Sequence, residues 1–173
     1  MRHISDEYLG MQTALHQNPA YGVASLSFAP LVRDLIVSSG AGSLLDYGAG
    51  KCRLRDALVE MGLKDLQYRP YDPVFPEYGP VVPSDIVTCI DVLEHIEPAY
   101  VEGVIDELWS STLRFGLFTI HSGAAIKNLP DGRNAHLIQE KSGWWLSKLC
   151  LRFDVIELQS VKGGFWVLVT PRK

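Results

Sequence analysis

The sequence predicts an α/β protein built on an open, mostly parallel sheet, and three observations support this class. Short apolar runs of strand length alternate with segments of helical spacing along most of the chain. A turn that contains glycines directly follows the first apolar run, as in sheets that bind ligands beyond the carboxyl ends of their strands. Near the C-terminus, two apolar runs joined by Gly163 and Gly164 are typical of an antiparallel pair.

The N-terminal part of the chain contains two expected helices and two expected strands. Residues 19–39 show helical spacing in their second half, and a glycine closes the pattern. The apolar run 44–47 has the character of a buried strand. Residues 53–61 form the next expected helix, which a glycine again ends, and residues 65–71 form the second expected strand.

After the second strand, a proline-rich connection, PVFPEYGPVVPSD, leads to the short apolar strand expected at 86–90. Helical spacing then returns before a longer apolar run, and a long polar loop precedes the last helix. The two strands of the hairpin close the chain. These later elements are expected at 99–111 (helix), 113–121 (strand), near 142–149 (helix), 153–159 (strand) and 165–170 (strand).

Composition limits the classes of protein to which the chain can belong. Its 173 residues, 47% of them hydrophobic and 21% charged, suffice for one globular domain with its own core. The net charge of −4 gives no general attraction to phosphate backbones. Unspecific binding of nucleic acids is therefore not expected from charge alone.

Cysteine usage and hydropathy predict where the protein resides. Cys52, Cys89 and Cys150 are odd in number and far apart, as expected for reduced intracellular thiols. The N-terminal segment MRHISDEYLG lacks the apolar core of a signal peptide. Nowhere does an apolar stretch approach the roughly 18 residues of a membrane helix. We therefore expect a cytoplasmic protein that does not associate with membranes, and the oligomeric state stays open.

The turn after the first strand is the first candidate ligand site. Asp46 precedes it, and Gly48 and Gly50 lie inside it. Glycines at such a turn let the backbone approach a ligand closely. A dinucleotide fingerprint would need a third glycine where the letters KCR follow, and the phosphate-binding P-loop pattern is missing too. The turn alone also fits a plain connection between strand and helix.

Two further motifs follow this turn in order, YDP at 71–73 and DVLEHIEP at 91–98. Together with DYGAG at 46–50, they resemble the motifs of the class I S-adenosylmethionine-dependent methyltransferases, over about residues 43–121. The resemblance implies a Rossmann-like methyltransferase fold, mostly parallel, with a C-terminal antiparallel hairpin. Because residues 72–85 form a short interval, we expect the usual third strand and its helix to be reduced to a loop.

The resemblance also implies one methyltransferase domain over residues 1–173, in which a helical segment, residues 1–40, covers the cofactor site. Within this segment, ALHQNPAYG is similar to stretches that cover the cofactor in some methyltransferases. It implies cofactor contacts from His16 and Tyr21. The alternative is the end of an N-terminal helix that packs on the sheet.

The cofactor implied by the resemblance is S-adenosylmethionine. Asp46 and the backbone of the glycine turn would face its methionine part, Asp72 would hold the ribose, and Pro73 would lie near the adenine. Its sulfonium is positive and needs no phosphate cradle, which agrees with the missing P-loop pattern. Cys52 departs from the family pattern, in which many members carry a third glycine. The residues implied for cofactor contact are Asp46, Tyr47, Gly48, Ala49, Gly50, Asp72, Pro73, Asp91 and Val92.

The candidate catalytic residues are Glu94, His95 and His136. Asp91, Glu94 and His95 would share one face if their turn is helical. With the distant His136 they are similar to the metal site of metal-dependent 2′-O-methyltransferases of small RNAs, which implies Asp91, Glu94, His95 and His136 as ligands of a divalent metal. Without a metal, Glu94 would brace the turn, and His95 or His136 would serve as general base toward a hydroxyl.

The long loop 122–141 is expected on the acceptor side of the site, because it follows a strand whose carboxyl end should open beside the cofactor. Its surroundings are locally basic, with Lys127, Arg133, Lys141 and Lys148. We expect O-methylation of a small molecule. An RNA or nucleotide acceptor, with or without metal assistance, and a non-catalytic cofactor-binding partner subunit are the alternatives.

Overall fold

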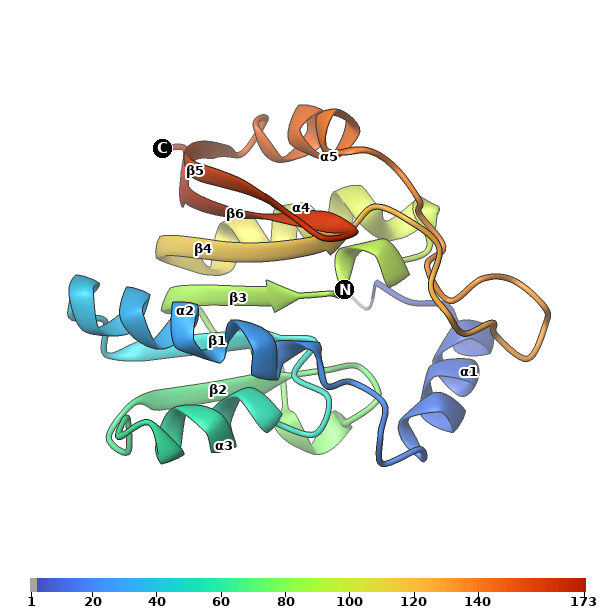
Figure 1. Cartoon of the computed structure of the whole chain (residues 1–173), viewed down its shortest axis with the longest axis horizontal. Coiled ribbons are helices and arrows are strands. Elements are labelled where there is room, and N and C mark those ends of the chain that lie inside the picture. The colour runs from blue at the N-terminus through green and yellow to red at the C-terminus, as the bar shows by residue number, and fades with distance from the viewer. Residues whose placement is uncertain (1–2) are drawn as a thin grey trace.

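A six-stranded sheet forms the centre of the protein (Figure 1), in a computed structural model that describes residues 3–173. Residues 1 and 2 of the expected N-terminal segment lie outside the described residues. The strand order is β2-β1-β3-β4-β6-β5, in which β6 alone runs antiparallel to both of its neighbours. This topology confirms the expected mostly parallel sheet with a C-terminal antiparallel hairpin. The strands are β1 (Ser43–Tyr47), β2 (Gln67–Tyr71), β3 (Ser84–Ile90), β4 (Thr112–His121), β5 (Phe153–Val161) and β6 (Gly164–Pro171).

Helices cover both faces of the sheet, with α2 and α3 on one face and α4 and α5 on the other (Figure 1). Successive side chains of a strand point to opposite faces, so a strand covered on both sides reads as a continuous apolar run. Leu44 of β1 packs with α2 and α3, whereas Leu45 packs with α4 and α5. The helices are α2 (Ala24–Ser39), α3 (Arg53–Glu60), α4 (Val101–Ser111) and α5 (Ser142–Leu149).

The connection between β2 and β3 is a loop, as expected from the sequence, where a further strand and helix would otherwise stand. Within the described chain, β2 is an edge strand, and the short helix Pro76–Tyr78 is the one regular element assigned before β3. The prolines of this connection lack the N–H that a further strand would have to donate to its neighbour. The third strand of the family pattern is therefore replaced by a loop that borders the site.

One further helix, α1 (Asp6–His16), lies across the carboxyl edge of the sheet beside the loop 122–141 (Figure 1). Tyr8 of α1 packs with Leu129 and Ala135 of this loop in a small apolar cluster of its own. The helix begins at Ser5, whose Oγ accepts a hydrogen bond from Tyr8 N at 3.2 Å. Glu97 fixes the same end, because its carboxylate accepts from the N–H and the Oγ of Ser5, both at 2.8 Å.

The turn after β3 differs from the expected helical arrangement. Asp91 has a positive φ of 52°, and only the short 3₁₀ segment Leu93–His95 follows it. A left-handed residue cannot belong to a right-handed helical turn. The expectation that Asp91, Glu94 and His95 share one helical face is therefore wrong.

Candidate functional site

A cavity of about 480 Å³ opens at the carboxyl edge of the sheet, between the strand ends, α1 and the loop 122–141. This volume lies within the range of small-molecule sites. All five histidines of the chain line it. The expected site residues also line it, with the exception of Glu94: they are His16, Tyr21, Asp46, Tyr47, Gly48, Ala49, Gly50, Asp72, Pro73, Asp91, Val92, His95 and His136.

The glycine turn after β1 is tightly enclosed. Gly48 has a φ of 80°, and a Cβ at this position would lie 2.4 Å from a methyl group of Val92. The N–H groups of Gly48 and Ala49 both donate to the Tyr71 carbonyl, at 2.7 and 3.0 Å. Cys52, which follows this turn, adopts a φ of 55°, so the backbone takes a left-handed conformation here at a residue other than glycine.

Asp72 ties the glycine turn to the loop after β2. One carboxylate oxygen accepts from Gly50 N at 3.0 Å and the other from Val74 N at 2.9 Å. Each carboxylate oxygen has a second lone pair, so both can still accept from a ligand hydroxyl. Burial raises the pKa of Asp72, and burial lowers the pKa of the neighbouring His16, whose ring packs edge-on against Tyr21 with centroids 5.0 Å apart.

Asp46 is buried at the end of β1 and bonded on both of its oxygens. It accepts from the hydroxyl of Tyr68 on β2 and, at 3.1 Å, from that of Thr88 on β3. Burial raises the pKa of Asp46 to about 6, against the opposing effect of these two bonds. The carboxylate thus joins three neighbouring strands, β2, β1 and β3, just before the glycine turn.

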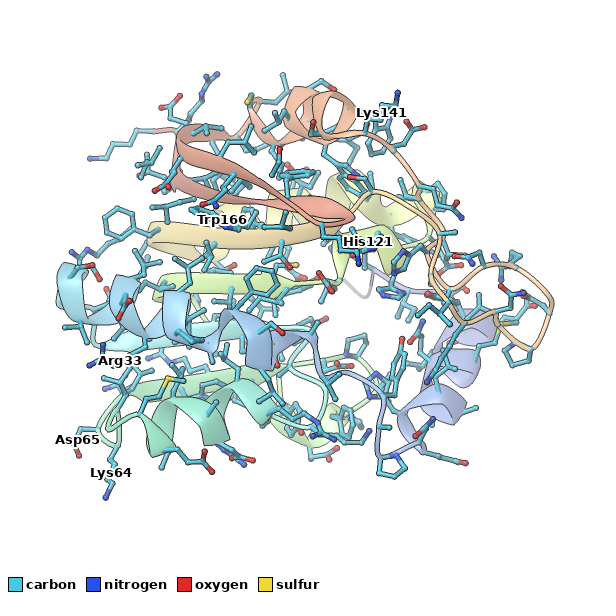
Figure 2. All side chains as sticks on the ribbon, viewed as in Figure 1. Arg33, Lys64, Asp65, His121, Lys141 and Trp166 are labelled. Carbon is cyan, nitrogen blue, oxygen red and sulfur yellow. The ribbon has the colours of Figure 1, made fainter. Side chains whose placement is uncertain are left out.

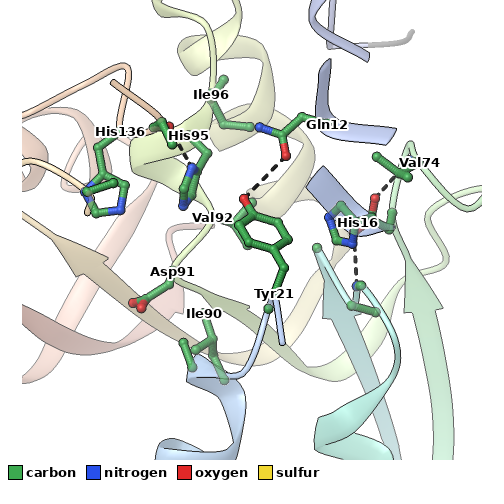
Figure 3. Close-up of a pocket in the computed structure, with 18 of the residues that line it drawn as sticks. Gln12, His16, Tyr21, Val74, Ile90, Asp91, Val92, His95, Ile96 and His136 are labelled. Carbon is green, nitrogen blue, oxygen red and sulfur yellow. Dashed lines mark hydrogen bonds between the residues drawn. The ribbon is translucent and has the colours of Figure 1, made fainter. Parts of the chain in front are cut away.

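Asp91 and Val92 lie at the end of β3. Thr119 Oγ1 donates to Asp91 Oδ1 and accepts from Asp91 N, both at 2.9 Å, which closes a small ring of bonds with β4. This ring holds Asp91 in its positive-φ conformation. Its side chain faces the part of the cavity that contains His136 and His95 (Figure 3).

His95 and His136 meet edge to face, with ring centroids 4.7 Å apart (Figure 3). The Nδ1 of His95 lies 2.7 Å from the Ala135 oxygen, and the Nδ1 of His136 lies 2.6 Å from the Gly123 oxygen. A carbonyl oxygen only accepts, so both Nδ1 atoms carry the proton, and each neutral ring has its lone pair on Nε2. Burial, followed by His136, lowers the pKa of His95 to about 4.

Glu94 is fully buried and does not line the cavity. Its Oε1 accepts from His121 N at 2.8 Å, and its Oε2 has no hydrogen-bond partner. Burial, followed by the charge of Asp91, raises the pKa of Glu94 to about 8, so the carboxyl group is mostly protonated at pH 7. Glu94 therefore has a structural role, in which it holds the backbone at the end of β4.

The four residues expected to bind a divalent metal do not fit one. Asp91, His95 and His136 line the cavity, but Glu94 does not: its Oε1 accepts from His121 N, and burial keeps its carboxyl group mostly protonated at pH 7. Across residues 3–173, no three His, Cys, Asp or Glu side chains are arranged to hold a metal ion. We therefore derive no chemical step through a metal.

Two of the basic residues around the loop 122–141 are paired with carboxylates. Arg133 pairs with Asp131 at 2.6 Å, and Lys148 pairs with Glu102 at 2.6 Å. Lys127 lines the cavity, with its ammonium 5.1 Å from the ring centroid of Tyr21.

Among the cavity residues to which the sequence analysis assigned no role are Tyr8 and Gln12 of α1. The Tyr8 hydroxyl donates to the His95 oxygen at 2.7 Å, and Gln12 Nε2 donates to Tyr8 at 2.6 Å. Gln12 in turn faces the hydroxyl of Tyr21 (Figure 3). Their spacing of four residues, which places them on one helix face, is the signal that would have paired them.

The described chain has the fold of the class I S-adenosylmethionine-dependent methyltransferases. It is similar in structure to the 1,6-didemethyltoxoflavin-N1-methyltransferase of Burkholderia thailandensis, solved with 1,6-didemethyltoxoflavin and S-adenosylhomocysteine. The two are 15% identical, with a TM-score of 0.64 over 100% of this chain and 92% of the other. It is also similar to the magnesium protoporphyrin IX methyltransferase of Synechocystis with bound S-adenosylmethionine, at 14% identity and a TM-score of 0.65 over 99% and 100% of the two chains.

A third similar structure is a 16S rRNA methylase, 14% identical, with a TM-score of 0.58 over 99% of this chain and 77% of the other. The sequence matches no protein-family model and no curated protein. At these identities the likeness shows the fold. In addition, no helix within residues 3–173 is long and apolar enough to cross a membrane.

Proposed function

We propose that this protein is an S-adenosylmethionine-dependent methyltransferase that methylates a hydroxyl oxygen of a small molecule. One observation carries the proposal: a single cavity joins Asp72 and the glycine turn at one end to the imidazoles of His95 and His136 at the other (Figure 3). A cofactor site and a proton acceptor thus share one space. This arrangement suits group transfer between two bound molecules.

The end of the cavity near the glycine turn suits the cofactor. Both oxygens of Asp72 can accept from the vicinal hydroxyls of a ribose, and Gly48 and Gly50 line the same end of the cavity. When bound, S-adenosylmethionine supplies an electrophilic methyl group on a sulfur that is already a good leaving group. The residues need to place the acceptor in line with that methyl group.

The other end of the cavity suits removal of a proton. We assign His136 as the general base, since its Nε2 lone pair faces the cavity and its Nδ1 proton is held by Gly123. As the acceptor oxygen takes the methyl group, its proton passes to this Nε2. His95, whose lowered pKa keeps it neutral at pH 7, packs edge to face against His136.

A small molecule is favoured over RNA because α1 and the loop 122–141 cover the cavity and the basic residues of this loop are partly paired. Arg133 and Lys148 are both occupied by carboxylates. An RNA-binding surface would instead need cations free to contact phosphates along a groove.

The test combines binding with transfer. S-adenosylhomocysteine should raise the melting temperature, and methyl-labelled cofactor should label a component of a metabolite extract. His136→Ala should lower the turnover rate by roughly 100-fold or more, with S-adenosylhomocysteine affinity changed only a few-fold. Labelling of RNA alone would replace the acceptor class, and a thermal shift without transfer to any acceptor would indicate a non-catalytic binding subunit. An unchanged turnover rate in His136→Ala would remove the assigned base.

A further inference from the structure

We propose that His121 is a positioning residue that fixes the tautomer and the orientation of His136. This inference rests on the proposed function, because it concerns the base assigned there. His121 ends β4 at the edge of the sheet that faces the cavity (Figure 2), and its ring centroid lies 4.9 Å from that of His136. It was not among the residues to which the sequence assigned a catalytic or binding role.

The backbone of Gly123 connects the two imidazoles. Its N–H donates to His121 Nδ1 at 3.1 Å, and its oxygen accepts from His136 Nδ1 at 2.6 Å. His121 Nδ1 also lies 3.2 Å from that oxygen, but an N–H can only donate, so this nitrogen is an acceptor. The proton of neutral His121 therefore sits on Nε2, whereas the proton of His136 sits on Nδ1. The bond that one ring nitrogen makes decides where the proton lies.

His121 is itself held from two sides. Its N–H donates to the buried Glu94 Oε1 at 2.8 Å. On the other side its ring lies against the turn between β5 and β6, where a Cβ on Gly163 would fall 2.5 Å from Nε2. Ser122 N donates to the Gly163 oxygen at 2.8 Å. The C-terminal hairpin thus supports a histidine that is linked to His136 through the backbone of one residue, Gly123.

The remaining freedom of His136 is small. Asn134 Oδ1 accepts from His136 N at 3.0 Å and from Ala125 N at 2.9 Å, which fixes the backbone on both sides of the loop. The ring orientation then depends on the Gly123 oxygen, which belongs to the peptide group that follows Gly123. The peptide group that precedes Gly123 is held by the bond from Gly123 N–H to His121, so His121 restrains this residue on one side and His136 contacts it on the other.

Two substitutions separate positioning from mere packing. His121→Leu removes the acceptor for Gly123 N–H, whereas His121→Asn keeps an oxygen near the position of Nδ1. The ¹⁵N chemical shifts of the His136 ring, measured near pH 8 and assigned with His136→Gln, report which nitrogen carries the proton. We expect the Nδ1–H form in the wild type and in His121→Asn, and a mixture of both tautomers in His121→Leu.

Turnover should follow the tautomer. His121→Leu should lower the turnover rate by roughly 10–100-fold, as loss of outer-shell partners does, while His121→Asn stays within about threefold. S-adenosylhomocysteine affinity should change only a few-fold in either variant. Lys162→Leu, which places a leucine at an exposed residue of the same hairpin turn, is the matched control and should match the wild type.

A second route tests the support from the hairpin. Gly163→Ala should displace His121 and produce the same mixture of His136 tautomers, because the new methyl group would meet Nε2. Adding His121→Asn, which lacks that atom, should restore the Nδ1–H form. An unchanged Nδ1–H signal in His121→Leu would overturn the proposal. If the wild type transfers no methyl group at all, the proposed function fails, and the spectra still decide the role of His121.

Discussion

At the scale of single residues, the site is made by side chains that hold backbone groups in place. Asp72 accepts from the N–H groups of two different loops, and Thr119 holds Asp91 in a left-handed conformation. His95 and His136 do the same, since the Nδ1 atom of each donates to a backbone carbonyl. The chemistry of the cavity therefore depends on bonds between residues that are far apart in the sequence.

The cofactor assignment predicts a specific loss in Asp72→Ala. Without the carboxylate, the ribose acceptor and the bonds to Gly50 and Val74 are all lost, so the melting-temperature rise given by S-adenosylhomocysteine should mostly disappear. Asp65→Ala removes an exposed carboxylate at the far end of the sheet (Figure 2) and should keep the full shift. Equal shifts in Asp72→Ala and the wild type would contradict the ribose assignment.

At the scale of elements, sequence patterns located most strands and helices, because apolar runs and glycine stops are local signals. The helix Ser142–Leu149 and the strand pair after it lie where spacing placed them. The turn after β3 could not be read in this way, because the positive φ of Asp91 is stabilised by Thr119, 28 residues later. The expected metal site failed for a similar reason, since Glu94 is bonded to the backbone of His121, 27 residues later, and does not line the cavity with the other three residues.

The helix α1 provides a prediction at this scale. Ser5→Ala removes the side chain that caps the helix and one of its two bonds to Glu97, at a cost of about 1 kcal/mol. In hydrogen exchange, the amides of α1 should open several-fold faster, while those of β3 stay unchanged. Ser38→Ala, on an exposed residue of α2, is the control. If β3 accelerated as much as α1, the helix would not be a separate unit of opening.

At the scale of the whole molecule, buried acids make stability depend on pH. The folded-state pKa of Glu94 is about 8, above its ordinary 4.5, so the folded protein binds the proton more tightly. This contribution is complete below about pH 4.5 and is lost as the pH rises toward 8. The pKa of His95 is lowered from 6.5 to about 4, which has the opposite effect: its contribution makes stability rise with pH up to about 6.5 and is constant above that pH.

Between pH 6.5 and 8 the effect of Glu94 should therefore be visible. We expect the melting temperature to fall over this range, and Glu94→Gln, which stays neutral and keeps an oxygen for His121 N–H, to flatten the decline. Glu140→Gln, at an exposed position of the loop 122–141, should retain the wild-type slope. A wild-type slope in Glu94→Gln would contradict the raised pKa.

The position of α1 has a consequence for the order in which the protein assembles. Its anchoring bonds join Ser5 to Glu97 and Tyr8 to His95, across 92 and 87 residues of chain. During synthesis, this helix emerges long before the segments that receive it. Contacts of such high sequence separation form slowly, because closing a long loop costs entropy and more local contacts form first. We infer that α1 docks late, and that the cavity closes only when the loop 122–141 has been translated.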